Sequence, residues 1–210
     1  HDIDFPAGVV NILSGPTREV ATTLSKSKIP SVLTMIGSTA TGQRVIADSV
    51  TSIKKLSMEL GGNAPFIVFE DADIDKALNL AVGIKFGNSG QICVAANRFF
   101  VHKSLYNSFL EKYVDRVNNL KLGFGLDKKP DMGPMVTRND RDRMFDLIND
   151  AIENGGVLLA GGEIPQGMED GNWMMPTVIS GMTTEMRLFR EETFGPIAPF
   201  MSFETDEEVL

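Results

Sequence analysis

Residues 58–75 read MELGGNAPFIVFEDADID, and they join two runs of alternating strand and helix. The apolar residues before Gly61 and Gly62 predict the end of a strand, and residues 65–69 predict a second, buried one. Asp71 or Asp73 can then cap a helix, because a carboxylate accepts hydrogen bonds from the free N–H groups of a first turn. The stretch therefore indicates an α/β fold.

The residues before this stretch show the same alternation. We expect strands at 9–13, 32–36 and near 53–58, with helices at 17–26 and from the Gly37-Ser38 turn to about residue 47. Buried strands that alternate with helices are typical of a parallel sheet with right-handed crossovers.

The residues after it continue the pattern. Ser104 and Thr137 are each placed to cap a long amphipathic helix, and the second helix should stop at Asn154-Gly155-Gly156. Residues 161–173 are rich in glycine and acids, which predicts an exposed loop. Thr205 caps a last helix. Further strands are expected at 98–101, 157–160, 177–179 and 199–203.

Composition excludes several classes of protein. A net charge of −8 and a pI near 4.8 argue against nucleic acid or an anionic membrane surface as a partner. No apolar run approaches the roughly 20 residues that span a bilayer. A single cysteine cannot form an internal disulfide, which fits a reducing compartment such as the cytoplasm. His1 and His102 lack the neighbouring ligands of a zinc site, so we expect no metal.

The one cysteine, Cys93, ends the sequence NSGQIC. A free cysteine is most often a buried, inert packing residue. Here Asn88, Gly90 and Gln91 supply flexibility and hydrogen-bonding groups in place of apolar neighbours, and such a setting favours a reactive thiol. Both readings stay open on local grounds.

Three other motifs could carry chemistry, and each has a plain alternative. IGSTATG at 36–42 places a glycine turn before a helix, where an anion can bind, but it is also an ordinary βα turn. Glu59 would become a general base if partial burial raised its pKa, or it is a surface acid. REETFGP at 190–196 could bind a ribose diol, or it is a charged helix end.

Taken in this order, IGSTATG, MELGGNAPFIVFEDADID, NSGQICVAANR and REETFGP closely resemble the NAD(P)-dependent aldehyde dehydrogenase superfamily. The resemblance covers essentially all 210 residues and is strongest to the semialdehyde branch, which includes succinate-semialdehyde enzymes. It implies a partial Rossmann-like cofactor domain at residues 1–58. It also implies an α/β catalytic domain at residues 59–210, incomplete at its C-terminal end.

The resemblance also implies roles for individual residues. Cys93 would attack the aldehyde, a hydride would leave to NAD or NADP, and Glu59 would activate the water that hydrolyses the thioester. The implied cofactor-binding residues are Gly37, Ser38, Gly42, Glu192 and Phe194. Cysteine suits the first step because a thiolate is more available and more nucleophilic than an alkoxide.

The resemblance leaves alternatives and departures. Transfer of the acyl group to a thiol such as coenzyme A, or a non-catalytic binding protein on the same scaffold, are the rival readings. Gly87 stands where succinate-semialdehyde enzymes often carry an arginine, and Ala95 where many carry a second cysteine. We expect the chain to be an excerpt of a larger enzyme, inactive alone, whose full-length form is a homodimer or homotetramer acting on a small aldehyde.

Overall fold

The structure, a computed structural model, describes residues 6–126 and 129–210. The chain divides into two compact units, His1–Gly61 (unit 1) and Gly62–Leu210 (unit 2). Within the described residues, no helix is both long and apolar enough to cross a membrane.

Unit 1 is built on a pair of parallel strands. Register pairs Val32 with Lys55 at one end and Gly37 with Leu60 at the other. A Cβ added to the buried Gly42 would lie 2.8 Å from Cδ2 of Leu60, so glycine lets a helix approach the strands closely. The elements of unit 1 are α1 (Thr17–Lys26), β1 (Val32–Gly37), α2 (Thr39–Asp48), a 3-10 turn (Ser49–Thr51) and β2 (Lys55–Leu60).

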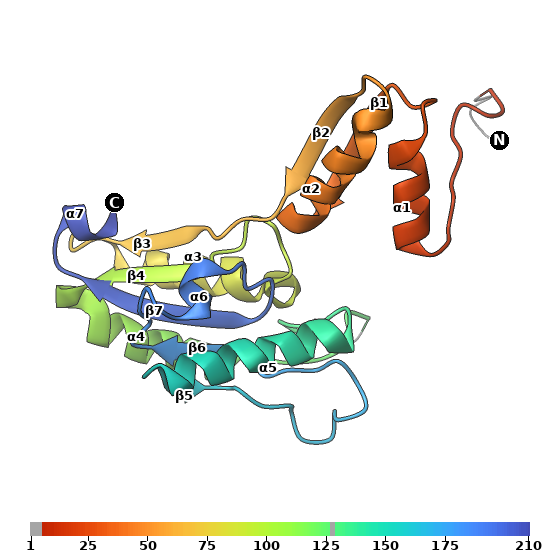
Figure 1. The fold of residues 1–210 in the computed structure, drawn as a ribbon. Coiled ribbons are helices and arrows are strands. Elements are labelled where there is room, and N and C mark those ends of the chain that lie inside the picture. Colours follow the sequence, from red (N-terminus) through yellow and green to blue (C-terminus); the bar gives the residue numbers. More distant parts are fainter. Residues whose placement is uncertain (1–5, 127–128) are drawn as a thin grey trace. The chain divides into compact units, whose positions relative to one another are not determined.

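Unit 2 contains a five-stranded sheet in the order β3-β4-β7-β6-β5, parallel except for β5 (Figure 1). Its strands are β3 (Pro65–Val68), β4 (Arg98–His102), β5 (Val157–Ala160), β6 (Thr177–Ser180) and β7 (Ile197–Phe203). Its helices are α3 (Ile74–Phe86), α4 (Lys103–Asn118), α5 (Arg138–Glu153), α6 (Arg187–Arg190) and α7 (Asp206–Val209), with a 3-10 turn at Gly87–Gly90.

Helices cover both faces of this sheet. Phe99 and Phe200 point to one side, where Leu78 of α3 and Tyr113 of α4 pack against them. Neighbouring strand residues point to the other side, where they meet α5 and α6. A three-layer arrangement buries two apolar faces, so the predicted α/β fold is confirmed.

Most predicted element positions are confirmed. Asp73 caps α3, since its Oδ1 accepts from the N–H of Lys76 at 3.1 Å. Thr137 caps α5 through the N–H of Asp140, also at 3.1 Å. Helix α5 then ends before Gly155, whose φ of +93° suits glycine.

Four predictions need correction. Residues 9–13 form no strand, and no ladder partner lies beside them within the described residues; an apolar run cannot pair by itself. His102, not Ser104, caps α4, because its Nδ1 accepts from the N–H of Ser104 at 3.3 Å. Thr205 precedes α7 but makes no side-chain cap bond there. In the loop 161–173, Trp173 is buried.

Candidate active site

Three loops of unit 2 meet at one edge of its sheet. Residues 62–64, 87–97 and 191–196 come directly before β3, β4 and β7, which are adjacent and parallel. Because the amino ends of parallel neighbours lie at the same edge, these loops are brought together. Gly62, the cysteine and the REETFGP motif therefore converge, although long stretches of sequence separate them.

The loop before Cys93 has an unusual backbone. Asn88, Ser89 and Gly90 have φ values of 49°, 57° and 71°, and the first two are not glycine. Such left-handed residues cost of order 1 kcal/mol each and cluster at functional sites. A local pair of bonds helps to hold them: Asn88 Nδ2 donates to the carbonyl of Gln91, and Gln91 Nε2 donates to that of Asn88.

Contacts with the segment before α5 fix this loop further. Ser89 Oγ donates to the carbonyl of Gly133 at 2.7 Å, and the N–H of Val136 donates to Gln91 Oε1 at 2.9 Å. Cys93 follows in a turn closed by the N–H of Ala95 and the carbonyl of Ile92. Cys93 is exposed, which fits the reactive reading of this cysteine better than the packing one.

The cysteine loop touches the 191–196 loop at two glycines. A Cβ added to Gly90 would lie 2.3 Å from the carbonyl oxygen of Gly195, and one added to Gly195 would lie 2.2 Å from Sδ of Met144. The first distance leaves no room for a side chain at Gly90, so the backbones of the two loops are in direct contact there. This contact places Glu192 and Phe194 on the loop that adjoins the cysteine loop.

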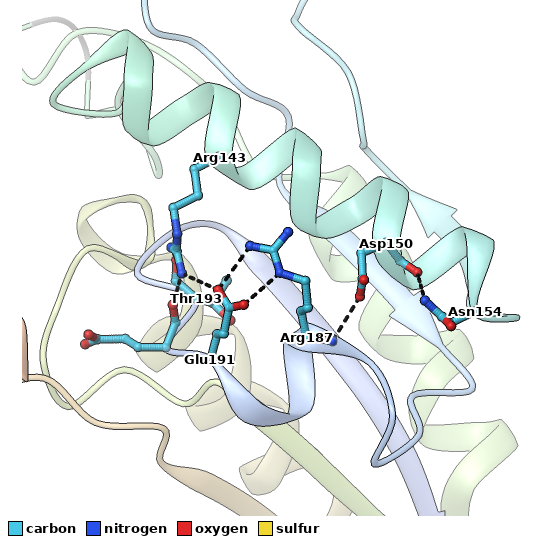
Figure 2. A network of polar contacts seen from close by, with 7 residues as sticks. Arg143, Asp150, Asn154, Arg187, Glu191 and Thr193 are labelled. Atoms are coloured by element: carbon cyan, nitrogen blue, oxygen red, sulfur yellow. Dashed lines mark hydrogen bonds and ion pairs between the residues drawn. The ribbon is translucent and has the colours of Figure 1, made fainter. Parts of the chain in front are cut away.

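Arg143 of α5 fixes the backbone around Glu192. Its Nη2 donates to the Glu192 carbonyl at 2.9 Å, and its Nη1 to the Thr193 carbonyl at 3.1 Å. Figure 2 shows this side chain reaching from α5 to the loop. The Glu192 carboxylate itself accepts from the N–H of Gly62 at 3.3 Å. Phe194 has a φ of 46° and is 41% exposed.

The carboxylate of Glu191 is bound by two arginines, whereas that of Glu192 accepts a hydrogen bond from a backbone N–H. Arg187 donates to Glu191 Oε1 at 2.7 Å, and Arg143 donates to Oε2 at 3.2 Å (Figure 2). These hydrogen bonds, that of Arg187 first, hold the pKa of Glu191 below its usual value. Sequence reasoning missed Arg143, because a cation on a charged helix face gives no local sign of a partner 48 residues away.

In unit 1, the Gly37-Ser38 turn opens α2. Ser38 Oγ accepts from the N–H of Thr41 at 3.3 Å and caps the helix. In the described part of the chain, the N–H groups of Thr39 and Ala40 have no protein partner. Free N–H groups and the positive end of a helix dipole form a suitable cradle for phosphate. Gly42, which the resemblance also implied, lies inside α2 and lets that helix pack closely against β2.

A groove of about 660 Å³ lies between α1 and α2. That volume is within the range of small-molecule and cofactor sites. Arg18 and Arg44 give it positive charge, and Thr41 extends it to the first turn of α2. Sequence reasoning did not identify this groove, because its lining comes from two helices that were interpreted separately.

Glu59 lies inside β2, where it pairs with Ile36. Glu59 and the Gly37-Ser38 turn therefore share the carboxyl edge of the strand pair. Glu59 is exposed, which agrees with the surface acid of the two alternatives and not with partial burial. The structure thus groups Gly37, Ser38, Gly42 and Glu59 in unit 1, and Cys93, Glu192 and Phe194 in unit 2.

Known proteins resemble this chain over its whole length. Residues 1–210 match the model of the aldehyde dehydrogenase family. The chain is 40% identical to the mitochondrial succinate-semialdehyde dehydrogenase of Oryza sativa subsp. japonica, over 98% of this chain and 39% of that protein. It is 38% identical to the succinate-semialdehyde dehydrogenase [NADP(+)] of Escherichia coli K12, over 98% of this chain and 42% of that protein.

A solved structure agrees with the sequence comparisons. Betaine aldehyde dehydrogenase from Staphylococcus aureus in complex with NAD⁺ superposes with a TM-score of 0.94 at 32% identity, over 99% of this chain and 42% of that chain. The chain therefore spans about two fifths of the length of the proteins that it matches.

Proposed function

The chain belongs to the aldehyde dehydrogenase family, and from that premise we propose that the intact protein oxidises an aldehyde to a carboxylic acid with NAD or NADP. One observation carries the proposal: an exposed thiol, Cys93, on a strained loop in direct contact with the loop of Glu192. A packing cysteine needs neither exposure nor left-handed neighbours.

Cys93 is the proposed nucleophile. Its thiolate forms a C–S bond to the aldehyde carbon, and the carbonyl π electrons move to oxygen to give a tetrahedral adduct. Collapse of that oxyanion expels the hydride of the former aldehyde C–H bond and leaves a thioester on Cys93. Water then attacks the thioester, releases the acid and regenerates the thiol. Glu59 is the proposed base for this water, which is a role that a carboxylate can fill.

NAD or NADP, when bound, supplies the hydride acceptor. The residues of unit 1 fit such a group, since free N–H groups at the start of α2 suit a pyrophosphate and the groove between α1 and α2 suits a nucleoside. Gly37 and Ser38 would form the phosphate turn, which Gly42 supports by packing. In unit 2, Glu192 would bind the nicotinamide ribose and Phe194 would pack beside it.

Semialdehydes are the first substrates to examine, since both sequence relatives are named for succinate semialdehyde. Gly87, in place of the arginine expected for a substrate carboxylate, argues against succinate semialdehyde itself. A reducing compartment, such as the cytoplasm, stays an expectation from the single cysteine of residues 1–210. Homo-oligomerisation stays a prediction from the resemblance.

The test is direct. The intact protein is incubated with NAD or NADP and a panel of aldehydes, and the reduced cofactor is followed by its absorbance. Product analysis should find the free acid, whereas an acyl-coenzyme A product would favour acyl transfer to a thiol. Absence of cofactor reduction with every aldehyde tested, in a folded protein with a titratable Cys93, would refute the proposal.

A further inference from the structure

A lysine is completely buried beside the candidate active site. Lys85 lies in the last turn of α3, with no exposed surface. Lysine is almost never fully buried unless its amine has a partner, because removing the charge from water is costly. Burial lowers the pKa of this amine to about 7. An apolar residue at this position would avoid the cost of desolvating the amine. The hydrogen bonds of the amine are therefore the reason to expect a role for Lys85.

The amine begins a chain of three hydrogen bonds that ends at Glu192. Lys85 Nζ donates to Oδ1 of the buried Asn97 at 3.1 Å. Asn97 Nδ2 donates to the carbonyl of Gly62, also at 3.1 Å, and the N–H of Gly62 donates to Glu192 Oε1 at 3.3 Å. These four residues connect all three loops of the candidate site.

Packing does not orient the Gly62 backbone. Gly62 is exposed, and a Cβ added there would meet nothing within 4 Å. The Gly62 carbonyl and the Gly62 N–H belong to the two peptide groups on either side of its Cα, and a hydrogen bond on each of them therefore fixes the backbone at this residue. Asn97 is itself held by its own N–H, which donates to the carbonyl of Ala64 at 2.9 Å.

Lys85 determines which end of the Asn97 amide faces Gly62. An asparagine side chain carries one acceptor and one donor group, and it can turn over unless its partners distinguish them. Within the described residues, Oδ1 of Asn97 has Lys85 Nζ as its hydrogen-bond partner. A donor on that side directs Nδ2 to the Gly62 carbonyl, whereas the opposite orientation would bring two oxygens together.

We propose that Lys85 and Asn97 are positioning residues, which hold the Gly62 carbonyl and thereby the backbone turn at Gly62, so that the Gly62 N–H keeps the Glu192 carboxylate in place for the cofactor. The inference deepens the proposed function and rests on it for the role of Glu192. The hydrogen-bond chain is a property of the folded protein and can be tested separately.

The first test measures amide hydrogen exchange in the intact protein. Lys85→Met removes the donor, and Asn97→Asp keeps the contact with Lys85 as an ion pair but loses the donor to Gly62. Both variants should exchange faster than wild type at residues 60–64 and 190–194. Leu78→Ala, a fully buried truncation on the same helix, controls for general destabilisation and should leave both segments unchanged. Unchanged exchange at 190–194 in both test variants would overturn the inference.

The second test separates binding from chemistry. Both variants should slow hydride transfer roughly tenfold or more in a rapid-mixing experiment, since small displacements of reacting groups are costly. The Kd for NAD or NADP should change less than about threefold, because the groove of unit 1 is intact. A structural role alone predicts wild-type transfer in Asn97→Asp, and that result would overturn the inference. A wild-type protein that oxidises no aldehyde would refute the proposed function, and the exchange experiment would still decide this inference.

Discussion

At the scale of single residues, Cys93 differs from most free cysteines, which are buried, in that it is exposed. The only thiol of the sequence is accessible, while Gln91 before its turn and Asn97 after it are held by hydrogen bonds. A fixed backbone and a free side chain are what a nucleophile requires, because its attack depends on orientation.

Cys93→Ala should abolish oxidation of every aldehyde by the intact protein, since Cys93 is the only cysteine of residues 1–210 and is the proposed site of the thioester. Wild type should take up one equivalent of iodoacetamide at Cys93 under native conditions, measured by mass spectrometry of the peptide that contains it, and lose activity in parallel. NAD or NADP should still bind to the variant. Substantial activity in Cys93→Ala would show that the thiol is not the acylation site.

Glu59→Gln should separate the two chemical steps. Hydride transfer precedes hydrolysis, so a burst of reduced cofactor should remain while turnover falls roughly 10²- to 10⁴-fold, the usual effect of losing a general base. Rapid mixing measures the burst, and steady-state assays measure turnover. Loss of the burst together with turnover would assign Glu59 an earlier role than water activation.

At the scale of elements, contact between two loops depends on the absence of side chains. Gly90→Ala combines a positive φ with a Cβ only 2.3 Å from the Gly195 carbonyl. We expect it to reduce the free energy of unfolding by about 1–3 kcal/mol and to displace Cys93. Urea unfolding followed by the fluorescence of Trp173, the one tryptophan, measures this in unit 2.

Gly83→Ala is the matched control for that substitution. Gly83 lies inside α3, and an added Cβ would meet nothing within 4 Å. Alanine should therefore raise the free energy of unfolding by roughly 0.5–1 kcal/mol through helix propensity. Equal effects at Gly83 and Gly90 would contradict the close contact of the two loops.

Buried Lys85 should make stability depend on pH. Its pKa is about 7 in the folded protein, against 10.5 for the ordinary group, so the unfolded chain binds the additional proton between these values. Stability should rise with pH across this window, and the full difference corresponds to roughly 5 kcal/mol. Trp173 fluorescence in urea at pH 7 and pH 9.5 measures it. Lys85→Met should show a clearly smaller rise, and an equal rise would assign the effect to other groups.

Local signals in the sequence predicted most elements, whereas contacts between distant elements could not be predicted from it. The caps at Asp73 and Thr137 are found as expected, because a cap needs only residues within one turn. The anchoring of the Glu192 backbone by Arg143 depends on packing across the sheet. The burial of Lys85 could have been predicted from the sequence. Lys85 follows the apolar residues Val82, Ala81 and Leu78 by three, four and seven positions, which is the spacing of one helix face.

At the scale of the whole molecule, the two units differ in how completely they cover their strands. Unit 2 buries both faces of five strands, while the described residues of unit 1, 6–61, form a single strand pair. A two-stranded sheet is marginal without further packing. Large apolar residues of unit 1 are exposed, including Val10, Ile12, Ile29, Ile36, Val50 and Ile53.

This difference predicts unequal resistance to proteolysis for residues 1–210. Cleavage requires local opening, and opening is easier where few apolar contacts must be broken. A protease of broad specificity should therefore degrade unit 1 first and leave a product that begins near Gly62, identified by mass spectrometry. Residues 62–210 expressed alone should unfold in urea within about 1 kcal/mol of the longer chain, as followed by Trp173. Simultaneous loss of both units, or an unfolded product, would show that the five-stranded sheet depends on unit 1 for its stability.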